Sequence, residues 1–212
     1  MVIRVLLADD HGVLRDGVRR LLEGEGMEVV AVVDTGREAV EKAAQLSPDV
    51  VVMDVTMPEL NGIEATRAIV TRAPATGVVI LSMHSSAKVI RQALLAGARG
   101  YVLKESAGDE VVRAVQAVAA GRPFMGDGVD KLLGEYLEGP SGPAGVDRLN
   151  PQEREILQLV AEGKSNAEAA EIMGLSPRTV ETYRGRLMQK LRLEDLPSLV
   201  KYAIRHGLTP LE

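Results

Sequence analysis

The chain of 212 residues contains no cysteine. Disulfide bonds, thiolate nucleophiles and zinc sites built from cysteine are therefore excluded. Aromatic residues are also scarce, with four tyrosines, one phenylalanine and no tryptophan. Binding of single-stranded nucleic acid by base stacking needs exposed rings, so this mode is not expected. The three histidines lie far apart in the sequence and show no metal-binding pair.

Long hydrophobic runs are absent as well. No apolar stretch approaches the roughly 18 residues that a membrane-spanning helix needs. The chain reaches acidic residues at positions 9 and 10, before any hydrophobic core of signal-peptide length, and it has no basic leader. We therefore expect a cytoplasmic protein with no membrane partner.

Charge is distributed unevenly along the chain. The net charge is −5, yet residues 147–212 contain ten basic and ten acidic residues and are neutral. Within this neutral part, the stretch from Arg178 to Arg192 has five basic residues and one acidic residue. Local clustering matters more for binding to nucleic acid than the global balance, so an acidic protein can still bind DNA.

Residues 1–121 alternate between short apolar runs and amphipathic stretches of helical length. Alternation of this kind is typical of β-α-β units, which form a parallel sheet with helices on both faces. We therefore predict a doubly wound α/β domain over residues 1–121. Its five strands are expected near residues 2–8, 28–33, 50–53, 78–81 and 100–103.

Residues 122–146 have a different composition. A short helix is possible over residues 130–137, and residues 139–145 are rich in glycine and proline with no apolar pattern. This composition predicts a linker that its two prolines stiffen slightly. The alternative is a long surface loop inside one domain.

Residues 147–212 show only helical patterns, so we predict a second, all-α domain. Asn150-Pro151-Gln152-Glu153 has the residues of a helix N-cap, a proline in the first turn and a capping box. Ser176-Pro177 repeats the cap and proline at a later helix start, and Gly174 lies just before it. Four helices are expected, two of which form a helix-turn-helix motif.

Polar side chains follow several of the predicted strands. They are Asp9 and Asp10, Asp54, Ser82 and Lys104. In an open parallel sheet, ligands bind at the carboxyl ends of the strands, so these side chains should converge. Clustered carboxylates need a cation, and Mg²⁺ prefers oxygen ligands of this type. The cluster therefore indicates a phosphoryl group held on an aspartate beside Mg²⁺. The alternative is a set of solvated strand ends.

Two kinds of phosphate chemistry fit this pattern less well. A nucleotide-binding turn rich in glycine is replaced by Asp9-Asp10-His11-Gly12. An aspartate-based phosphohydrolase usually has a second aspartate two residues after its nucleophile, where this chain has Thr56. A Mg²⁺-dependent phosphatase fused to a helical domain nevertheless stays open.

The helix expected over residues 177–191 has one apolar and one polar side at 100° per residue. Its apolar side holds Val180, Tyr183, Leu187 and Leu191, its opposite side is polar, and basic residues lie on the flanks between them. In a major groove, its central residues would meet base edges and its flanking cations would meet phosphates. The alternative is a basic solvated helix in a plain bundle. The predicted DNA contacts are Arg178, Glu181, Thr182, Arg184, Gly185, Arg186, Gln189 and Lys190.

Three motifs in the first domain carry a family resemblance. Residues 7–11 (LADDH), 52–62 (VMDVTMPELNG) and 100–104 (GYVLK) resemble the receiver domain of two-component response regulators. The resemblance implies that a sensor histidine kinase phosphorylates Asp54. It also implies that Asp10, Asp54 and the backbone carbonyl of Thr56 bind Mg²⁺, with Asp9 acting through water. The alternative is a regulator that has a degenerate receiver and acts without phosphorylation.

The same resemblance assigns switch roles to residues around the phosphoacceptor. Ser82 and Tyr101 match the family's switch hydroxyl and switch aromatic, and Lys104 ends the matching motif at residues 100–104. For Tyr101 the alternative is a buried core tyrosine. His84 lies two residues after Ser82. It is either a solvated loop histidine or a residue that influences hydrolysis of the acyl phosphate.

Residues 149–157, 162–166 and 175–182 look like the LuxR-type helix-turn-helix domain. Together the two resemblances identify a member of the NarL/FixJ-type response regulators, which are not enzymes. They imply that phosphorylation frees the DNA-binding domain and favours a homodimer on double-stranded DNA. Gly185 departs from the pattern, because glycine inside a helix costs about 1 kcal/mol relative to alanine.

Overall fold

The structure is a computed structural model that describes residues 2–129, 131–132, 149–193, 195–205 and 208. These residues form two compact units, one before residue 133 and one from residue 149 onward. None of the described helices is long and apolar enough to cross a membrane. The short helix expected over residues 130–137 lies mostly outside the described residues.

The first unit is built on a parallel sheet with the strand order β2-β1-β3-β4-β5-β6. Its central strands are buried on both faces, which is why they read as continuous apolar runs in the sequence. The strands are β1 (Arg4–Ala8), β2 (Glu28–Val33), β3 (Val50–Met53), β4 (Gly77–Ser82), β5 (Gly100–Leu103) and β6 (Phe124–Met125).

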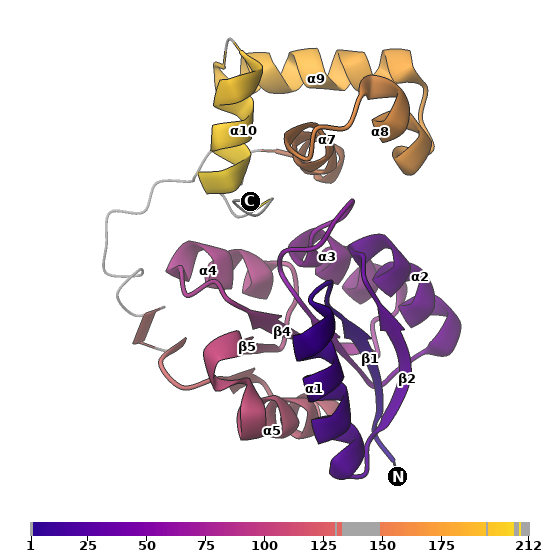
Figure 1. The fold of residues 1–212 in the computed structure, drawn as a ribbon, viewed down its shortest axis with the longest axis vertical. Coiled ribbons are helices and arrows are strands. Elements are labelled where there is room, and N and C mark those ends of the chain that lie inside the picture. The colour runs from indigo at the N-terminus through magenta and orange to yellow at the C-terminus, as the bar shows by residue number, and fades with distance from the viewer. Residues whose placement is uncertain (1, 130, 133–148, 194, 206–207, 209–212) are drawn as a thin grey trace. The chain divides into compact units, whose positions relative to one another are not determined.

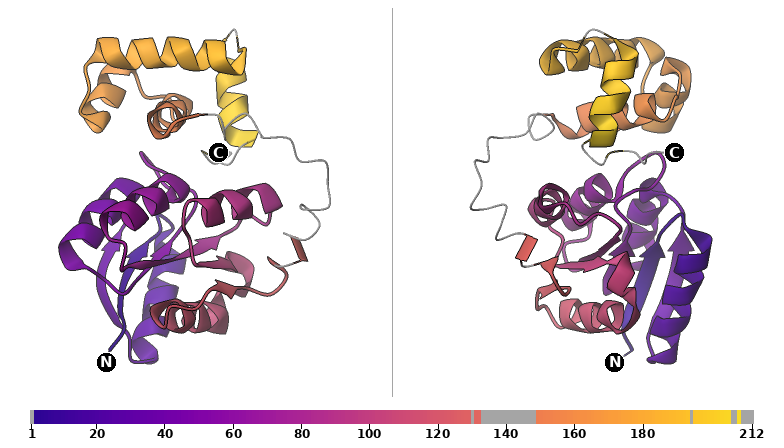
Figure 2. Two further views of the ribbon diagram at one scale, coloured as in Figure 1. Left: turned by 180° about the vertical axis from the view of Figure 1, so that it is seen from behind. Right: turned by 60° about the vertical axis from the view of Figure 1, so that its left-hand side comes forward.

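Helices cover both faces of this sheet (Figures 1 and 2). One apolar cluster packs α2, α3 and α4 on one face, and a second cluster packs α1 and α5 on the other. The predicted doubly wound α/β architecture is thereby confirmed. The helices are α1 (Gly12–Gly24), α2 (Gly36–Leu46), α3 (Gly62–Arg72), α4 (Ala87–Leu95) and α5 (Ala107–Ala119), with a short 3₁₀ turn, η1, at Lys104–Ser106.

The number of strands differs from the prediction. Five strands were expected, and β6 adds a sixth beyond the boundary expected at residue 121. It pairs in parallel with β5, so that Gly100 lies opposite Phe124 and Tyr101 opposite Met125. A strand of two residues has no periodicity to detect, and only its pairing with β5 defines it.

The loop between β3 and α3 follows the predicted phosphoacceptor directly. Asn61 caps α3 by accepting hydrogen bonds from the backbone N–H groups of Ile63 and Glu64. A Cβ on Gly62 would overlap the carbonyl oxygen of Asp54, so this position accepts only glycine. Gly62 therefore lets α3 start close against the end of β3.

The second unit contains the four predicted helices, α7 (Pro151–Ala161), α8 (Asn166–Met173), α9 (Pro177–Leu191) and α10 (Leu196–Arg205). Asn150 with Glu153, and Ser165 with Glu168, form capping boxes at the starts of α7 and α8. Gly174 ends α8 at φ 67°, a left-handed conformation that suits glycine. The turn at Gly174 directs the chain into α9 and completes the helix-turn-helix motif.

Candidate phosphoacceptor site and DNA interface

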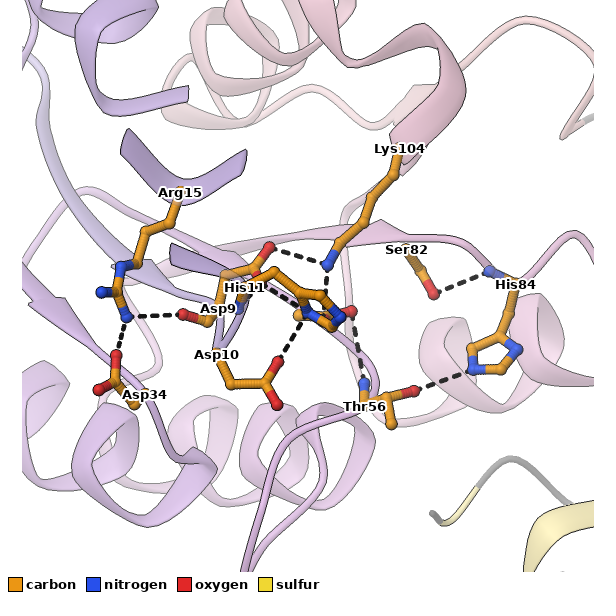
Figure 3. A network of polar contacts seen from close by, with 10 residues as sticks. Asp9, Asp10, His11, Arg15, Asp34, Thr56, Ser82, His84 and Lys104 are labelled. Carbon is orange, nitrogen blue, oxygen red and sulfur yellow. Dashed lines mark hydrogen bonds and ion pairs between the residues drawn. The ribbon is translucent and has the colours of Figure 1, made fainter. Parts of the chain in front are cut away.

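The carboxyl edge of the sheet brings the predicted acidic cluster together. Asp9 and Asp10 follow β1, Asp54 follows the neighbouring β3, and Lys104 follows β5. Figure 3 shows that the Lys104 side chain reaches toward the aspartates from the opposite side of the cluster. Parallel strands end at one edge, so residues separated by up to 95 positions in the sequence meet here.

Lys104 bridges the two buried aspartates. Its Nζ lies 2.7 Å from Oδ2 of Asp54 and 2.9 Å from Oδ2 of Asp9. Asp54 is 3% exposed and Asp9 is 1% exposed, so both carboxylates are nearly removed from solvent. Buried charges are stable only when they are paired, and Lys104 supplies that pairing among the described residues.

The environment of the cluster shifts the pKa values of its members. Burial raises the pKa of the Asp54 carboxyl to about 6, and the charge and hydrogen bond of Lys104 offset only part of that effect. Burial acts to lower the pKa of Lys104, but the carboxylates of Asp54 and Asp9 raise it more, so its ammonium stays charged. A further cation in the cluster would favour the ionised form of Asp54.

His11 joins the cluster, which the spacing of the histidines did not predict. Its Nδ1 lies 2.9 Å from Oδ1 of Asp10, 3.3 Å from Oδ1 of Asp9 and 3.7 Å from Oδ2 of Asp54. Its backbone N–H also donates to Asp9 Oδ1 at 2.8 Å. The signal available in the sequence was its position immediately after the aspartate pair.

The donor set fits a divalent cation. One ligand atom from each of Asp9, Asp10, His11 and Asp54 lies within 4.8 Å of the other three. Oxygen-rich sites with few protein carboxylates are typical of Mg²⁺. The cluster is therefore an acidic pocket that could bind a metal ion, as the strand ends predicted.

A second set of hydrogen bonds, centred on His84, lies beside the pocket. Nε2 of His84 lies 2.9 Å from Oγ1 of Thr56, and the backbone N–H of His84 donates to Oγ of Ser82 at 3.1 Å. His84 is half-buried, and burial together with the charge of Lys104 lowers its pKa. It is therefore bonded to the loops of the pocket and is not the freely solvated histidine of one alternative (Figure 3).

Tyr101 already lies inside the protein. Its side chain is fully buried, and its hydroxyl donates to the carbonyl oxygen of His84 at 2.7 Å. Burial raises the pKa of the Tyr101 hydroxyl, so it stays protonated as a donor. Tyr101 is therefore buried, as its alternative as a core tyrosine predicted, and its role as a switch stays a prediction.

The predicted DNA-contacting residues lie on the solvent side of α9. All eight are exposed except Arg184, which is half-buried, whereas Val180 and Leu187 are fully buried. An added Cβ on Gly185 would have no neighbour within 4 Å among the described atoms. A shallow hollow of about 380 Å³ lies on this helix, lined by Ser176, Arg178, Thr179, Thr182, Tyr183 and Arg186. Its two arginines make it attractive to an anion.

Lys190 has a contact that its flanking position did not predict. Its Nζ lies 2.7 Å from Oε2 of Glu153 in α7. The same carboxylate accepts a hydrogen bond from the backbone N–H of Asn150 at 2.8 Å, so it closes the capping box as well. Glu153 therefore ties α9 to the first turn of α7.

Replacing Glu153 with glutamine is expected to destabilise the second unit by about 1–3 kcal/mol. Burial acts to raise the pKa of Glu153, but the hydrogen bonds from Lys190 and Asn150 outweigh it, so the pKa lies below its usual value. The stabilisation is therefore complete above the unfolded pKa of about 4.3 and fades as pH falls through the folded value. Urea unfolding at pH 7 and pH 4 measures both effects, with the exposed Glu181→Gln as control. Equal stability of Glu153→Gln and wild type at pH 7 contradicts the prediction.

Comparison with known proteins assigns each unit to a family. The model of the response regulator receiver domain matches residues 5–116, and that of the bacterial regulatory proteins of the luxR family matches residues 147–203. The transcriptional regulatory protein MctR of Rhizobium johnstonii is 40% identical over 208 residues, covering 97% of this chain and 95% of MctR. The response regulator UvrY of Escherichia coli K12 is 34% identical over 213 residues, covering 100% and 98%.

Solved structures agree with these sequence matches. A LuxR-family response regulator from Aurantimonas has a TM-score of 0.63 at 38% identity and covers 66% of this chain and 100% of its own. RcsB of Salmonella enterica serovar Typhimurium, bound to a promoter in the presence of the phosphomimetic BeF₃⁻, has a TM-score of 0.64 at 28% identity. That match covers 95% of this chain and 98% of RcsB.

The fold and the acidic pocket define a receiver, and the helix-turn-helix unit follows it. The chain belongs to the two-component response regulators with a LuxR-type DNA-binding domain, as its motifs predicted. This family consists of DNA-binding transcription regulators and not of enzymes. The alternative of a Mg²⁺-dependent phosphatase is therefore set aside.

Proposed function

We propose that Asp54 receives a phosphoryl group from a sensor histidine kinase, with Mg²⁺ as the cofactor. The pairing of a buried Asp54 with Lys104 at 2.7 Å supports this proposal most directly. In the transfer, an Asp54 oxygen attacks phosphorus, the phosphorus–nitrogen bond of the kinase phosphohistidine breaks, and the departing imidazole nitrogen keeps the bond's electron pair and takes a proton. Lys104 balances negative charge on the transferred oxygens.

The residues that would hold Mg²⁺ are Asp10, Asp54 and the backbone carbonyl of Thr56, with Asp9 contributing through water. When bound, the ion supplies positive charge that stabilises phosphoryl transfer. The intact cluster around Asp54 also opposes the alternative of a degenerate receiver. His84 and Thr56 stand beside the expected phosphoryl group, so we propose that they influence its hydrolysis.

Residues 1–121 form the proposed phosphoacceptor domain, residues 122–146 the proposed linker and residues 147–212 the proposed DNA-binding domain. Phosphorylation would bias a receiver with two conformations, with Ser82 and Tyr101 as its switch, release the second domain and favour a homodimer. Because its target would be promoter DNA, we place the protein's action in the cytoplasm. A dimer would fit an operator with two half-sites.

The test uses the full chain, acetyl phosphate and Mg²⁺. Intact mass is expected to rise by one phosphate, sizing to show conversion to a dimer, and affinity for duplex DNA to increase. Omitting Mg²⁺ is the matched control and is expected to suppress the mass shift. A chain that gains no phosphate under these conditions, or gains it equally without Mg²⁺, contradicts the proposal.

Arg186→Ala is expected to weaken binding to all duplex sequences alike. Arg186 is exposed on α9 and lines the hollow, where it would contact a phosphate. Loss of one phosphate contact lowers the slope of log affinity against log salt by about one. Titrations at several salt concentrations measure this slope, with Arg72→Ala in α3 as the control for a lost surface charge. An unchanged slope removes Arg186 from the phosphate contacts.

Glu181→Ala is expected to change which sequences bind. Glu181 is exposed at the centre of the predicted interface and can accept a hydrogen bond from a cytosine amino group. The loss of discrimination should be about 1–3 kcal/mol at one base position. A binding selection on randomised duplexes compares this variant with wild type. Identical preferred sites would leave Glu181 as an inert surface acid.

A further inference from the structure

Glu110 is a buried carboxylate outside the phosphoacceptor pocket. It lies in α5 and is only 5% exposed. Its Oε2 accepts a hydrogen bond from the Ser106 hydroxyl at 2.9 Å, and its Oε1 accepts one from the backbone N–H of Asp127 at 3.1 Å. The carboxylate thus joins two segments that flank α5 in the sequence. Removal of such a group from water is unfavourable unless its contacts compensate, and here the Arg113 guanidinium, 3.8 Å from Oε1, adds an ion pair to the two hydrogen bonds.

The first of these segments carries Lys104. The 3₁₀ turn η1 spans Lys104–Ser106, so the hydroxyl held by Glu110 is two residues from the lysine that bridges Asp9 and Asp54. The same hydroxyl lies 3.2 Å from the carbonyl oxygen of Leu103, at the end of β5. Glu110 therefore restrains the turn that positions the Lys104 ammonium.

The second segment begins the connection toward the DNA-binding unit. Directly after β6, the Gly126 N–H donates to the carbonyl oxygen of Tyr101 at 2.8 Å. Val129 is fully buried in the same apolar cluster as Tyr101. The main chain of the connection is thus hydrogen-bonded to the main chain of the predicted switch residue.

The atoms around the Glu110 carboxylate are closely packed. A Cβ on Gly126 would lie 2.5 Å from Oε2 of Glu110 and 3.3 Å from the carbonyl oxygen of Tyr101. Arg113 also lies in α5, and its guanidinium is 5.7 Å from the centre of the Phe124 ring in β6. This cation–π contact holds β6 against α5. We therefore expect a displacement of η1 to move β6 as well.

We propose that Glu110 is a positioning residue that transmits the state of the phosphoacceptor to β6. The inference rests on the proposed phosphorylation of Asp54. When Lys104 shifts from the free carboxylates to a phosphoryl oxygen, η1 shifts with it, and Ser106, Glu110 and Asp127 pass the movement to the start of the connection. The state of the phosphoacceptor then reaches the start of the connection through hydrogen bonds within the receiver.

Glu110→Gln in the full chain tests the proposal. Glutamine keeps the size, but it removes the charge that pairs with Arg113, and its amide nitrogen cannot accept the hydrogen bond that Ser106 or Asp127 donates. Asp109→Asn is the matched control, since it removes the same charge from an exposed neighbour. We expect both variants to take up one phosphate, because Asp54 is unchanged in each. The gain in DNA affinity on phosphorylation should fall roughly tenfold only in Glu110→Gln, a typical size for coupling between sites.

Hydrogen exchange provides a readout that a purely structural role would not move. With BeF₃⁻ and Mg²⁺, protection of the Gly126 and Asp127 amides should change in wild type and Asp109→Asn but not in Glu110→Gln. Gly126→Ala, with Gly24→Ala as its unhindered control, gives the same test if Glu110→Gln does not fold. If the wild-type protein takes up no phosphate, the proposed function is wrong. If wild type and Glu110→Gln respond alike in both DNA affinity and hydrogen exchange, this inference alone is wrong.

Discussion

Asp54→Asn is expected to abolish phosphorylation while the protein stays folded. The amide preserves the shape of the side chain but is not a nucleophile. It also removes one negative charge from beside Asp9, so the pocket is relieved of repulsion and loses one of the two carboxylates that pair with Lys104. Intact mass after incubation with acetyl phosphate and Mg²⁺ measures the effect, and circular dichroism checks the fold.

Asp34→Asn is the control for the Asp54 experiment. Asp34 also follows a strand of the same sheet, but its side chain is 64% exposed and paired with Arg15, outside the buried cluster. This variant should gain one phosphate at the wild-type rate. An Asp54→Asn protein that gained phosphate equally fast would locate the acceptor at another residue.

Lys104→Ala is expected to lower the free energy of unfolding of the receiver by about 3–5 kcal/mol. Removing one partner of a buried ion pair leaves the other charge without compensation, and here two carboxylates lose the same partner. Denaturant unfolding at neutral pH measures the loss. Lys42→Ala, on the exposed side of α2, is the control and should change stability by less than about 0.5 kcal/mol.

The same substitution should separate phosphorylation from its consequence. Asp54 remains present, so Lys104→Ala should still take up phosphate, whereas the movement that follows Lys104 is lost. Sizing after phosphorylation is expected to show no dimer in Lys104→Ala and a dimer in Lys42→Ala. Normal dimerisation of phosphorylated Lys104→Ala would remove Lys104 from the switch.

Much of the architecture follows from local patterns. Apolar runs that alternate with amphipathic stretches determined the α/β receiver, and caps such as Asn150 and Ser176 marked the starts of helices in the second unit. The same patterns placed Asp9, Asp54 and Lys104 at strand ends. Since parallel strands end at a common edge, their convergence could be predicted without coordinates. The basic, exposed side of α9 likewise followed from 100° periodicity.

Other features depend on contacts between residues far apart in sequence. The two residues of β6 become a strand only by pairing with β5, and Glu110 acquires its role only because η1 and β6 both pack against α5. The pairing of Lys190 with Glu153 similarly needs α7 beside α9. Periodicity and caps report on neighbours within a few residues, so they predict the elements and the chemical groups at their ends. Register and side-chain packing, which balance many weak interactions across the whole fold, decided which of those groups touch.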